Sequence, residues 1–363
     1  MQSMANFSLF LMLSCLTHFA FAQDVLQPEW IIRKTSPVAS GNAEAWGIDF
    51  DSKGNLYWAT NQARPGFLQG LDVVFYKLDQ DGNEIWQTPT IYAGQHNQQI
   101  YKVTATDSII YLGGRNCTQF TLDPDLPFCD MLLLAVDTAT GDTLWATTWD
   151  RGFGYEEADG LVVQSDGIYV SGWSVGDNTD TDMGLMKLNF NGEIVWTNAW
   201  GTTDRDHQDG HSVVDDSVIY AAGLMGGPVN PGLCLIKDYN GKAVLAKFSR
   251  ENGEYLDHLA FGRSDPWCNF ENALGMASNG LRLYVIGVTA IASDDIQIFL
   301  KAFDKNLNMI WETEWGGSDA EAARAIAVGA DGSIYVGGNT KSFGAGDPED
   351  LSATQARSIL NVE

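Results

Sequence analysis

A four-residue pattern that begins with tyrosine recurs along this 363-residue chain and divides it into units of similar length. Most copies read Tyr-x-x-Gly, as YVSG does from Tyr169, whereas the first copy, YWAT from Tyr57, lacks the glycine. The six copies begin at Tyr57, Tyr111, Tyr169, Tyr220, Tyr284 and Tyr335, and they are spaced 51 to 64 residues apart. A unit of this length cannot bury its apolar face alone, so several copies must stack against one another.

Each unit contains four short apolar runs, which residues 149–200 show most clearly. The runs are too short for helices and are bounded by Gly, Asp or Asn, which is typical of a meander of antiparallel strands. The third runs read VVFYKLD, LLLAVD, GLMKLN, LCLIKD and IFLKAFD. The fourth run carries a tryptophan at Trp30, Trp86, Trp145, Trp196 and Trp311, with Leu245 standing at the fifth place. Turns such as NFNGEIVW precede most of these positions and supply the positive φ that a tight hairpin needs.

Four strands in about 50 to 60 residues is the period of one blade of a β-propeller. We therefore predict an all-β protein, a six-bladed β-propeller of four-stranded antiparallel blades, in a single domain spanning residues 23–363. The lone Trp30 strand, EWIIRKT, would pair with the last apolar segment, ARSILNVE, and close the ring, since unpaired sheet edges are a liability. The end of the chain matches the repeat poorly, so the alternative is an incomplete last repeat within a longer protein.

Residues 1–22 form a candidate signal peptide. Most of this segment is an apolar run too short to span a membrane comfortably, and it ends in Ala-Phe-Ala before Gln23, which fits the small-x-small cleavage rule. Its first ten residues carry no Lys or Arg, which is unusual for a signal, and lipidation of Cys15 is the alternative. We expect a secreted protein, either extracellular, periplasmic or on the cell surface. No later run reaches the ~18 apolar residues of a spanning helix, so no membrane span is expected.

The formal net charge of the chain is −26, and the candidate signal peptide contributes none of it. Such a field repels nucleic acid and anionic lipid, and it leaves cations, basic proteins and neutral glycans as partners. The simpler interpretation is that the charge keeps an exported monomer soluble.

Four of the five cysteines lie after the leader. Cys117 and Cys129 flank the irregular segment CTQFTLDPDLPFC, and in an oxidising compartment this predicts a disulfide between them. Cys234 lies in an apolar run and Cys268 in a loop, and both are predicted to be free thiols. Apolar surroundings raise the pKa of a thiol, so a catalytic role for Cys234 is not expected.

Two segments of the repeat resemble known families. WGGSDAEAARAIAVGADGSIYVGGNT and WDRGFGYEEADGLVVQSDGIYVSGWS are similar to the SBBP-type β-propeller repeats of secreted bacterial proteins, and the likeness extends over nearly the whole of residues 23–363. DTATGDTLW is also similar to the repeat of PQQ-type propellers. The first resemblance implies a secreted or surface propeller without assigned chemistry.

The segments that lead into the first strands carry acids at a regular place. A small residue, Gly47, Gly160, Gly210, Gly275 or Ala325, marks the first strand of five units, with Lys102 at the sixth place. Four residues before it, or three in the first unit, lie Glu44, Glu156, Asp206, Glu271 and Glu321. First strands surround the axis of a propeller, so these carboxylates are predicted to form an acidic ring at the channel mouth that binds a cation or the amine or hydroxyl groups of a ligand. The alternative is that they are solvated loop acids.

Other candidate sites are weaker. Asp177, Asp180 and Asp182 have the oxygen chemistry of a calcium site, but the twelve-residue calcium loop is absent, and hydrogen bonding at the start of a strand is the alternative. His207 and His211 would share a zinc ion only if their segment curled, because four residues along a strand span ~13 Å. GWSVG, residues 172–176, matches the nucleophile elbow in sequence, but a loop rather than a helix follows it, and we reject that reading.

These features favour a secreted binding or scaffold propeller that uses loops around an acidic channel mouth to bind a ligand, glycan or protein partner. No cofactor is expected except calcium at the acidic positions. The alternative is a carbohydrate-active enzyme, a hydrolase or lyase with paired carboxylates at the channel mouth. A quinone-dependent dehydrogenase is disfavoured, because the adjacent cysteines common in PQQ dehydrogenases are absent.

Overall fold

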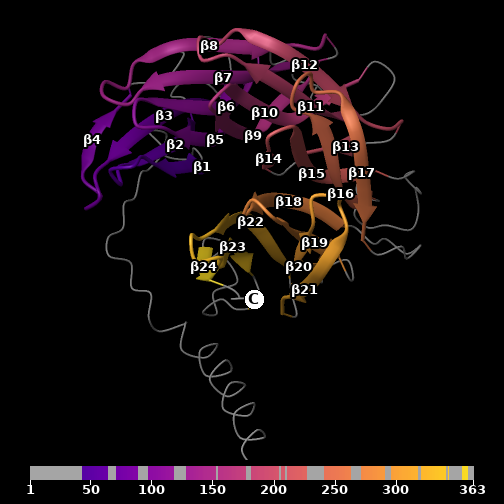
Figure 1. Ribbon diagram of the computed structural model, residues 1–363. Coiled ribbons are helices and arrows are strands. Elements are labelled where there is room, and N and C mark those ends of the chain that lie inside the picture. The colour runs from indigo at the N-terminus through magenta and orange to yellow at the C-terminus, as the bar shows by residue number, and fades with distance from the viewer. Residues whose placement is uncertain are drawn as a thin grey trace, which may run out of the picture. The chain divides into compact units, whose positions relative to one another are not determined.

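The computed structural model describes residues 43–63, 71–88, 97–117, 128–152, 154–176, 181–203, 206–208, 211–226, 241–262, 271–290, 296–317, 320–340, 342 and 354–358. In these residues the chain forms strands and no helix, and the strands make six antiparallel sheets in chain order (Figure 1). The prediction of an all-β chain of four-stranded antiparallel sheets is thereby confirmed. No helix able to cross a bilayer occurs in the described part of the chain.

The sheets are named A to F in chain order. Sheet A contains β1 (Ala43–Phe50), β2 (Leu56–Ala63), β3 (Leu71–Leu78) and β4 (Glu84–Gln87). Sheet B contains β5 (Asn97–Ala105), β6 (Ile109–Cys117), β7 (Cys129–Asp137) and β8 (Thr143–Trp149). Sheet C contains β9 (Glu156–Gln164), β10 (Gly167–Val175), β11 (Thr181–Leu188) and β12 (Ile194–Trp200).

Sheet D contains β13 (Asp206–His207), β14 (Ser212–Val214), β15 (Val218–Gly226), β16 (Gly241–Ser249) and β17 (Tyr255–Phe261). Sheet E contains β18 (Glu271–Ser278), β19 (Leu283–Ala290), β20 (Ile296–Phe303) and β21 (Met309–Trp315). Sheet F contains β22 (Glu321–Val328), β23 (Ile334–Thr340) and β24 (Thr354–Ser358). In sheet D the first strand is broken, because β13 and β14 both pair with β15.

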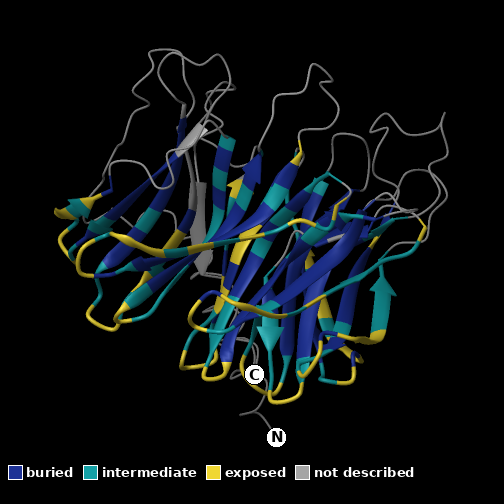
Figure 2. Ribbon diagram, turned by 90° about the horizontal axis from the view of Figure 1, so that it is seen from above, coloured by how far each residue is buried: buried dark blue, intermediate teal, exposed yellow. Residues whose placement is uncertain are grey.

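Apolar side chains fill the space between consecutive sheets. Five buried clusters join sheets A and B, B and C, C and D, D and E, and E and F. Each cluster includes the tyrosine of the repeated tetrad, such as Tyr57 between A and B or Tyr169 between C and D. The core therefore lies between sheets, which is why one repeat cannot fold alone. Figure 2 shows the buried strands and the exposed turns at one edge of the sheets.

The glycine of the Tyr-x-x-Gly tetrad is explained by a bulge in the neighbouring first strand. In sheet C the register of β9 and β10 shifts between Ser171 and Gly172, and a Cβ at Gly172 would collide with the Glu157 carbonyl oxygen. Gly114, Gly287 and Gly338 face a backbone carbonyl oxygen in the same way. A side chain at this place would force the bulged strand away from its partner, so glycine recurs there.

In sheets A, B and C the tryptophan of the fourth strand packs on the hairpin glycine of the next sheet. Gly192, with φ of 82°, lies against the Trp145 indole, and the indole N–H donates to the Phe190 carbonyl at 3.0 Å. Gly141 and Gly253 meet Trp86 and Trp196 in the same way. The two sequence markers, tryptophan and turn glycine, are thus the two halves of one contact between sheets.

The fourth unit differs from its prediction. Its third strand is β16, and the LCLIKD segment that was expected to form it lies outside the described residues. Leu245 lies in β16 and does not stand in for a tryptophan. By register, Asp257 of β17 occupies the tryptophan place, since it pairs with Lys247 as Trp196 pairs with Lys187. In the next hairpin the glycine is also replaced, by the buried Leu307 with φ of 67°.

Cys117 and Cys129 face each other across β6 and β7 and form a disulfide. Cys234 and Cys268 lie outside the described residues, as do the signal peptide and the Trp30 strand. The last segment contributes β24, which pairs with β23 as a third strand.

Removing this disulfide should lower stability. The loop it closes spans 12 residues, for which the chain-entropy model gives ~3 kcal/mol. We expect the C117S/C129S variant to lose about that much free energy of unfolding in urea. The wild type should lose the same amount when dithiothreitol is added, while the variant should be unaffected. Equal stability of oxidised wild type and variant would contradict this expectation.

Candidate functional site

Four of the five predicted carboxylates occupy one structural place. Glu156, Asp206, Glu271 and Glu321 are each the first residue of a first strand: β9, β13, β18 and β22. All four are less than 5% exposed, so they are not the solvated loop acids of the alternative interpretation. The acidic ring itself stays a prediction.

The first two sheets differ at this place. Glu44 is the second residue of β1, and by register Ala43 is the counterpart of Glu156, since the bulged residue comes three positions after each. The side chain of Glu44 lies outside the described part. In sheet B the place is taken by Gln98, which is 1% exposed. The sequence reasoning missed Gln98 because it searched for acids only, although counting four residues back from Lys102 finds it.

Three of the buried carboxylates are held by hydrogen bonds. Asp206 accepts hydrogen bonds from the backbone N–H of Thr202 and, at 3.1 Å, from that of Gly226. Glu321 accepts one from the Gly317 N–H at 3.1 Å, which again lies four residues earlier. Glu271 accepts from the Thr289 hydroxyl at 3.2 Å and pairs with the Lys301 ammonium at 3.3 Å. Asp206 and Glu321 thus anchor the segment that enters their first strand, while Glu271 is held by the second and third strands of its own sheet.

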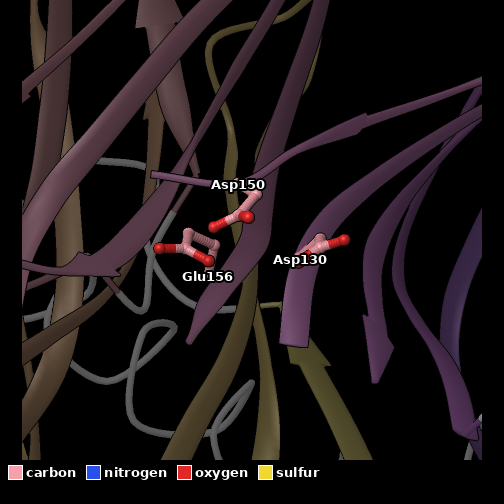
Figure 3. A group of neighbouring side chains, drawn as sticks. All are labelled: Asp130, Asp150 and Glu156. Carbon is pink, nitrogen blue, oxygen red and sulfur yellow. The ribbon is translucent and has the colours of Figure 1, made fainter. Parts of the chain in front are cut away.

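Glu156 lacks such an anchor. Its residue is 0% exposed, and neither carboxylate oxygen makes a hydrogen bond of ordinary geometry. Burial, followed by the Asp150 charge, raises its pKa to about 8, while the backbone and charge of Arg151 oppose this rise only in part. One oxygen each of Asp130, Asp150 and Glu156 lie within 4.8 Å of one another (Figure 3). This cluster joins β7 and the segment after β8 in sheet B to β9 in sheet C.

Aromatic and charged side chains gather beside Glu156. The Tyr155 and Trp173 rings stack at 4.5 Å with an 11° angle between their planes. The Arg115 guanidinium lies over Tyr155 and pairs with Glu157 at 2.8 Å. All four residues are only partly buried. The sequence reasoning singled out Glu156 and missed its neighbour Glu157, although the two must face opposite ways because side chains alternate along a strand.

Two basic residues meet on first strands that are far apart in sequence. Lys102 Nζ of β5 and His211 Nε2, just before β14, are 2.9 Å apart. Burial lowers the Lys102 pKa to about 8, and burial together with the Lys102 charge lowers the His211 pKa to about 3. Neutral His211 therefore accepts a hydrogen bond from Lys102. This contact makes a shared zinc site with His207 implausible, and the His207 side chain lies outside the described part.

The His211 pKa predicts a pH effect on stability. The pKa of His211 is about 3 in the folded chain, against an ordinary value of 6.5. At a pH between these two values, His211 binds a proton in the unfolded chain but not in the folded chain. Stability is therefore full above pH ~6.5 and is lost as the pH falls through this window, by at most ~1.4 kcal/mol per pH unit. His211 is partly exposed as a residue, so water reduces the effect. We expect the free energy of unfolding of H211Q to fall less steeply than that of wild type between pH 6.5 and 4; parallel profiles would exclude this role.

The structure also places the remaining candidates. Asp182 is buried in β11 and pairs with Arg151 at 2.5 Å, while Asp177 and Asp180 lie outside the described residues. The GWSVG segment lies largely in β10, within an antiparallel sheet, where a nucleophile elbow does not occur.

No family model matches this sequence, and neither does any curated protein. Solved structures of similar fold were found. Kuenenia stuttgartiensis hydrazine synthase is 9% identical, with a TM-score of 0.50 over 81% of this chain and 73% of that chain. The Neurospora crassa Pan2 WD40 domain is 12% identical, with a TM-score of 0.46 over 82% and 86%. A thermostable family-43 glycoside hydrolase is 10% identical, with a TM-score of 0.41 over 79% and 97%.

At such identities a likeness shows the fold alone. With the stacked four-stranded sheets, it fits a β-propeller. Function has to be argued from the residues.

Proposed function

We propose that this chain is a secreted binding propeller that takes a glycan at the edge of the sheets where the first strands begin. The observation that carries this proposal is the partly exposed stack of Tyr155 on Trp173 beside the Arg115–Glu157 ion pair. Ligand sites combine aromatic surface with a few well-placed polar groups. A sugar ring presents apolar C–H groups to aromatic faces and hydroxyls to carboxylate and guanidinium groups.

The two edges of the sheets differ in a way that supports this role. At one edge, short hairpins are closed by an Asp or Asn side chain that accepts backbone N–H groups, as Asp79 does from Asp81 and Asn83. At the other edge, the segments between second and third strands vary in length, from five residues between β19 and β20 to fourteen between β15 and β16. Variable connections on a rigid scaffold are the usual place of binding sites.

The remaining expectations belong to the same proposal. Export after cleavage before Gln23, a relation to SBBP-type repeats, and a monomeric six-bladed ring closed by the Trp30 strand against β24 all suit a surface or secreted binding protein. N-terminal sequencing of the exported chain should begin at Gln23. Amide hydrogen exchange should show slow exchange for residues 29–35 if that strand is paired.

A glycan screen on residues 23–363 tests the binding role. We expect binding to at least one class of glycan and a loss of tenfold or more in affinity in W173A and in E157Q. Y255A is the matched control, because Tyr255 stacks on Trp200 at 4.8 Å, between fourth strands of sheets C and D. No binding by wild type, or an equal loss in Y255A, would refute the proposal.

The same glycans separate binding from catalysis. We expect bound glycan to be recovered intact after long incubation with the wild type. Release of new reducing ends, or of unsaturated products, would instead favour the carbohydrate-active enzyme. Asp206, Glu271 and Glu321 are tied to their own loops or to Lys301, which argues against them as a catalytic pair.

A further inference from the structure

Three of the junctions between consecutive sheets share one three-residue arrangement. The first member lies near the start of the third strand of one sheet. The second directly follows the fourth strand of that sheet, and the last is the residue that begins the first strand of the following sheet. Between sheets C and D these are Asp182, Gly201 and Asp206, and between E and F they are Gln297, Gly316 and Glu321. Between B and C they are Asp130, Asp150 and Glu156.

The middle residue lies between the other two. A Cβ at Gly201 would contact the carboxylates of both Asp182 and Asp206, and a Cβ at Gly316 would contact Gln297 and Glu321. Glycine therefore suits the middle place. Between sheets B and C the middle residue is Asp150 instead of glycine, and it adds a third carboxylate beside those of Asp130 and Glu156.

At two other junctions a basic side chain of the protein compensates the negative charge. The Arg151 guanidinium pairs with Asp182 between sheets C and D. The Lys301 ammonium pairs with Glu271, the first residue of sheet E. Glu156 has no ion pair and no hydrogen bond of ordinary geometry with any described residue, although it is fully buried. A buried ionised carboxylate is costly unless a cation or hydrogen bonds satisfy it.

The chemistry of the three residues selects the kind of cation. They offer oxygen atoms only, which suit hard divalent cations and not zinc, which prefers nitrogen and sulfur. Calcium binds oxygen at ~2.3 to 2.6 Å, so ligands on opposite sides of the ion lie ~5 Å apart. The three carboxylate oxygens lie within 4.8 Å of one another, which fits that span. Magnesium, with bonds of ~2.0 to 2.1 Å and strict octahedral geometry, demands a tighter and more regular arrangement of oxygens.

The cluster is also held in place from both sides. The Cys117–Cys129 disulfide pins the start of β7 directly before Asp130. The Cys129 N–H donates to the Gly154 carbonyl at 2.9 Å, which ties the segment between Asp150 and Glu156 to β7. A preorganised oxygen cage loses less entropy when it binds an ion.

We propose that Asp130, Asp150 and Glu156 form a calcium site that joins sheets B and C. The calcium site is separate from the group formed by Arg115, Tyr155, Glu157 and Trp173. Tyr155 and Glu157 are the chain neighbours of Glu156, and successive side chains of a strand point to opposite faces. The bound ion would fix the strand that carries those two residues. The proposal does not depend on a glycan ligand.

The test uses residues 23–363 after treatment with a chelator, with calcium chloride as the only ligand. We expect one calcium ion per chain by calorimetry and a saturating rise in melting temperature, with a midpoint at or below the ~0.1 to 1 mM range of extracellular calcium modules. Magnesium at the same concentration should produce a smaller rise. E156Q and D150G should each weaken calcium binding by tenfold or more.

Two features keep the variants interpretable. D150G restores the glycine found at the other junctions, and E156Q replaces a buried carboxylate by a neutral amide, so both should fold and melt no lower than calcium-free wild type. E321Q is the matched control, because Glu321 holds the same place but is anchored by backbone N–H groups, and it should keep the calcium response. Absence of calcium binding by wild type, or an unchanged response in E156Q and D150G, would overturn the site. Because no glycan is present, neither result bears on the glycan proposal.

Discussion

Replacing Gly114 by alanine should destabilise the protein severely, whereas replacing its neighbour Gly113 should not. A Cβ at Gly114 would lie 2.9 Å from the Gln99 carbonyl carbon and from the Ile100 Cα, and closer still to the Gln99 oxygen. These atoms belong to the bulged backbone of β5, so no side chain can swing away to make room. Forced backbone shifts in a packed sheet cost ~1 to 3 kcal/mol or more, and we expect at least the upper end here.

Gly113 supplies the control within the same YLGG tetrad. A Cβ there would meet only side chains, with Leu161 Cδ1 at 3.5 Å and Ala158 Cβ at 3.6 Å, which are ordinary contact distances. The free energy of unfolding of G113A should therefore lie within about 1 kcal/mol of the wild-type value. Alanine also restricts the unfolded chain more than glycine does, which favours the folded state. Urea unfolding of both variants measures the difference. Equal stability of G113A and G114A would show that the bulge does not select glycine.

The fold was predictable because its markers are contacts between sheets that recur in each unit. The tetrad glycine faces the bulged backbone of a first strand, and the tryptophan packs on a hairpin glycine. Because each contact recurs in several units, the residues that make it recur at the same places in the sequence. The prediction went wrong in the fourth unit, where Asp257 stands in place of the tryptophan, and Leu307 of the next hairpin replaces the glycine that would face it. Without the tryptophan the Asn252-Gly253 turn was passed over, and the third strand was placed too early.

The candidate site was predictable only in part. The spacing from the bulge located Glu156, Asp206, Glu271 and Glu321, because a first strand has a fixed register against its partner. The spacing could not show that hydrogen bonds or an ion pair hold the carboxylates of Asp206, Glu271 and Glu321, whereas that of Glu156 lacks such partners among the described residues. Nor could it find Asp130, which comes from another strand 26 positions earlier and reaches Glu156 only through the packing of two sheets.

Removing the buried cation of sheet E should have the other large effect. Lys301 is 4% exposed, and its ammonium lies 3.3 Å from Glu271 and 3.1 Å from Glu312. Methionine keeps the length and apolar stem of lysine but not its charge. K301M would remove the Lys301 cation from the Glu271 carboxylate, which is itself 2% exposed. Breaking a buried pair from one side costs ~3 to 5 kcal/mol, because the remaining charge keeps its desolvation penalty.

Two further variants identify the cause of that loss. In K301M/E271Q both charges are gone, so most of the stability should return, since replacing a buried pair entirely is often nearly neutral. K187M removes a lysine from the third strand of sheet C, where the partner Asp166 is 44% exposed. Water screens that pair, and we expect a loss of ~1 kcal/mol or less. If K301M and K187M lost the same free energy of unfolding, or if E271Q failed to rescue K301M, the destabilisation would come from lost packing of the lysine stem and not from the stranded carboxylate.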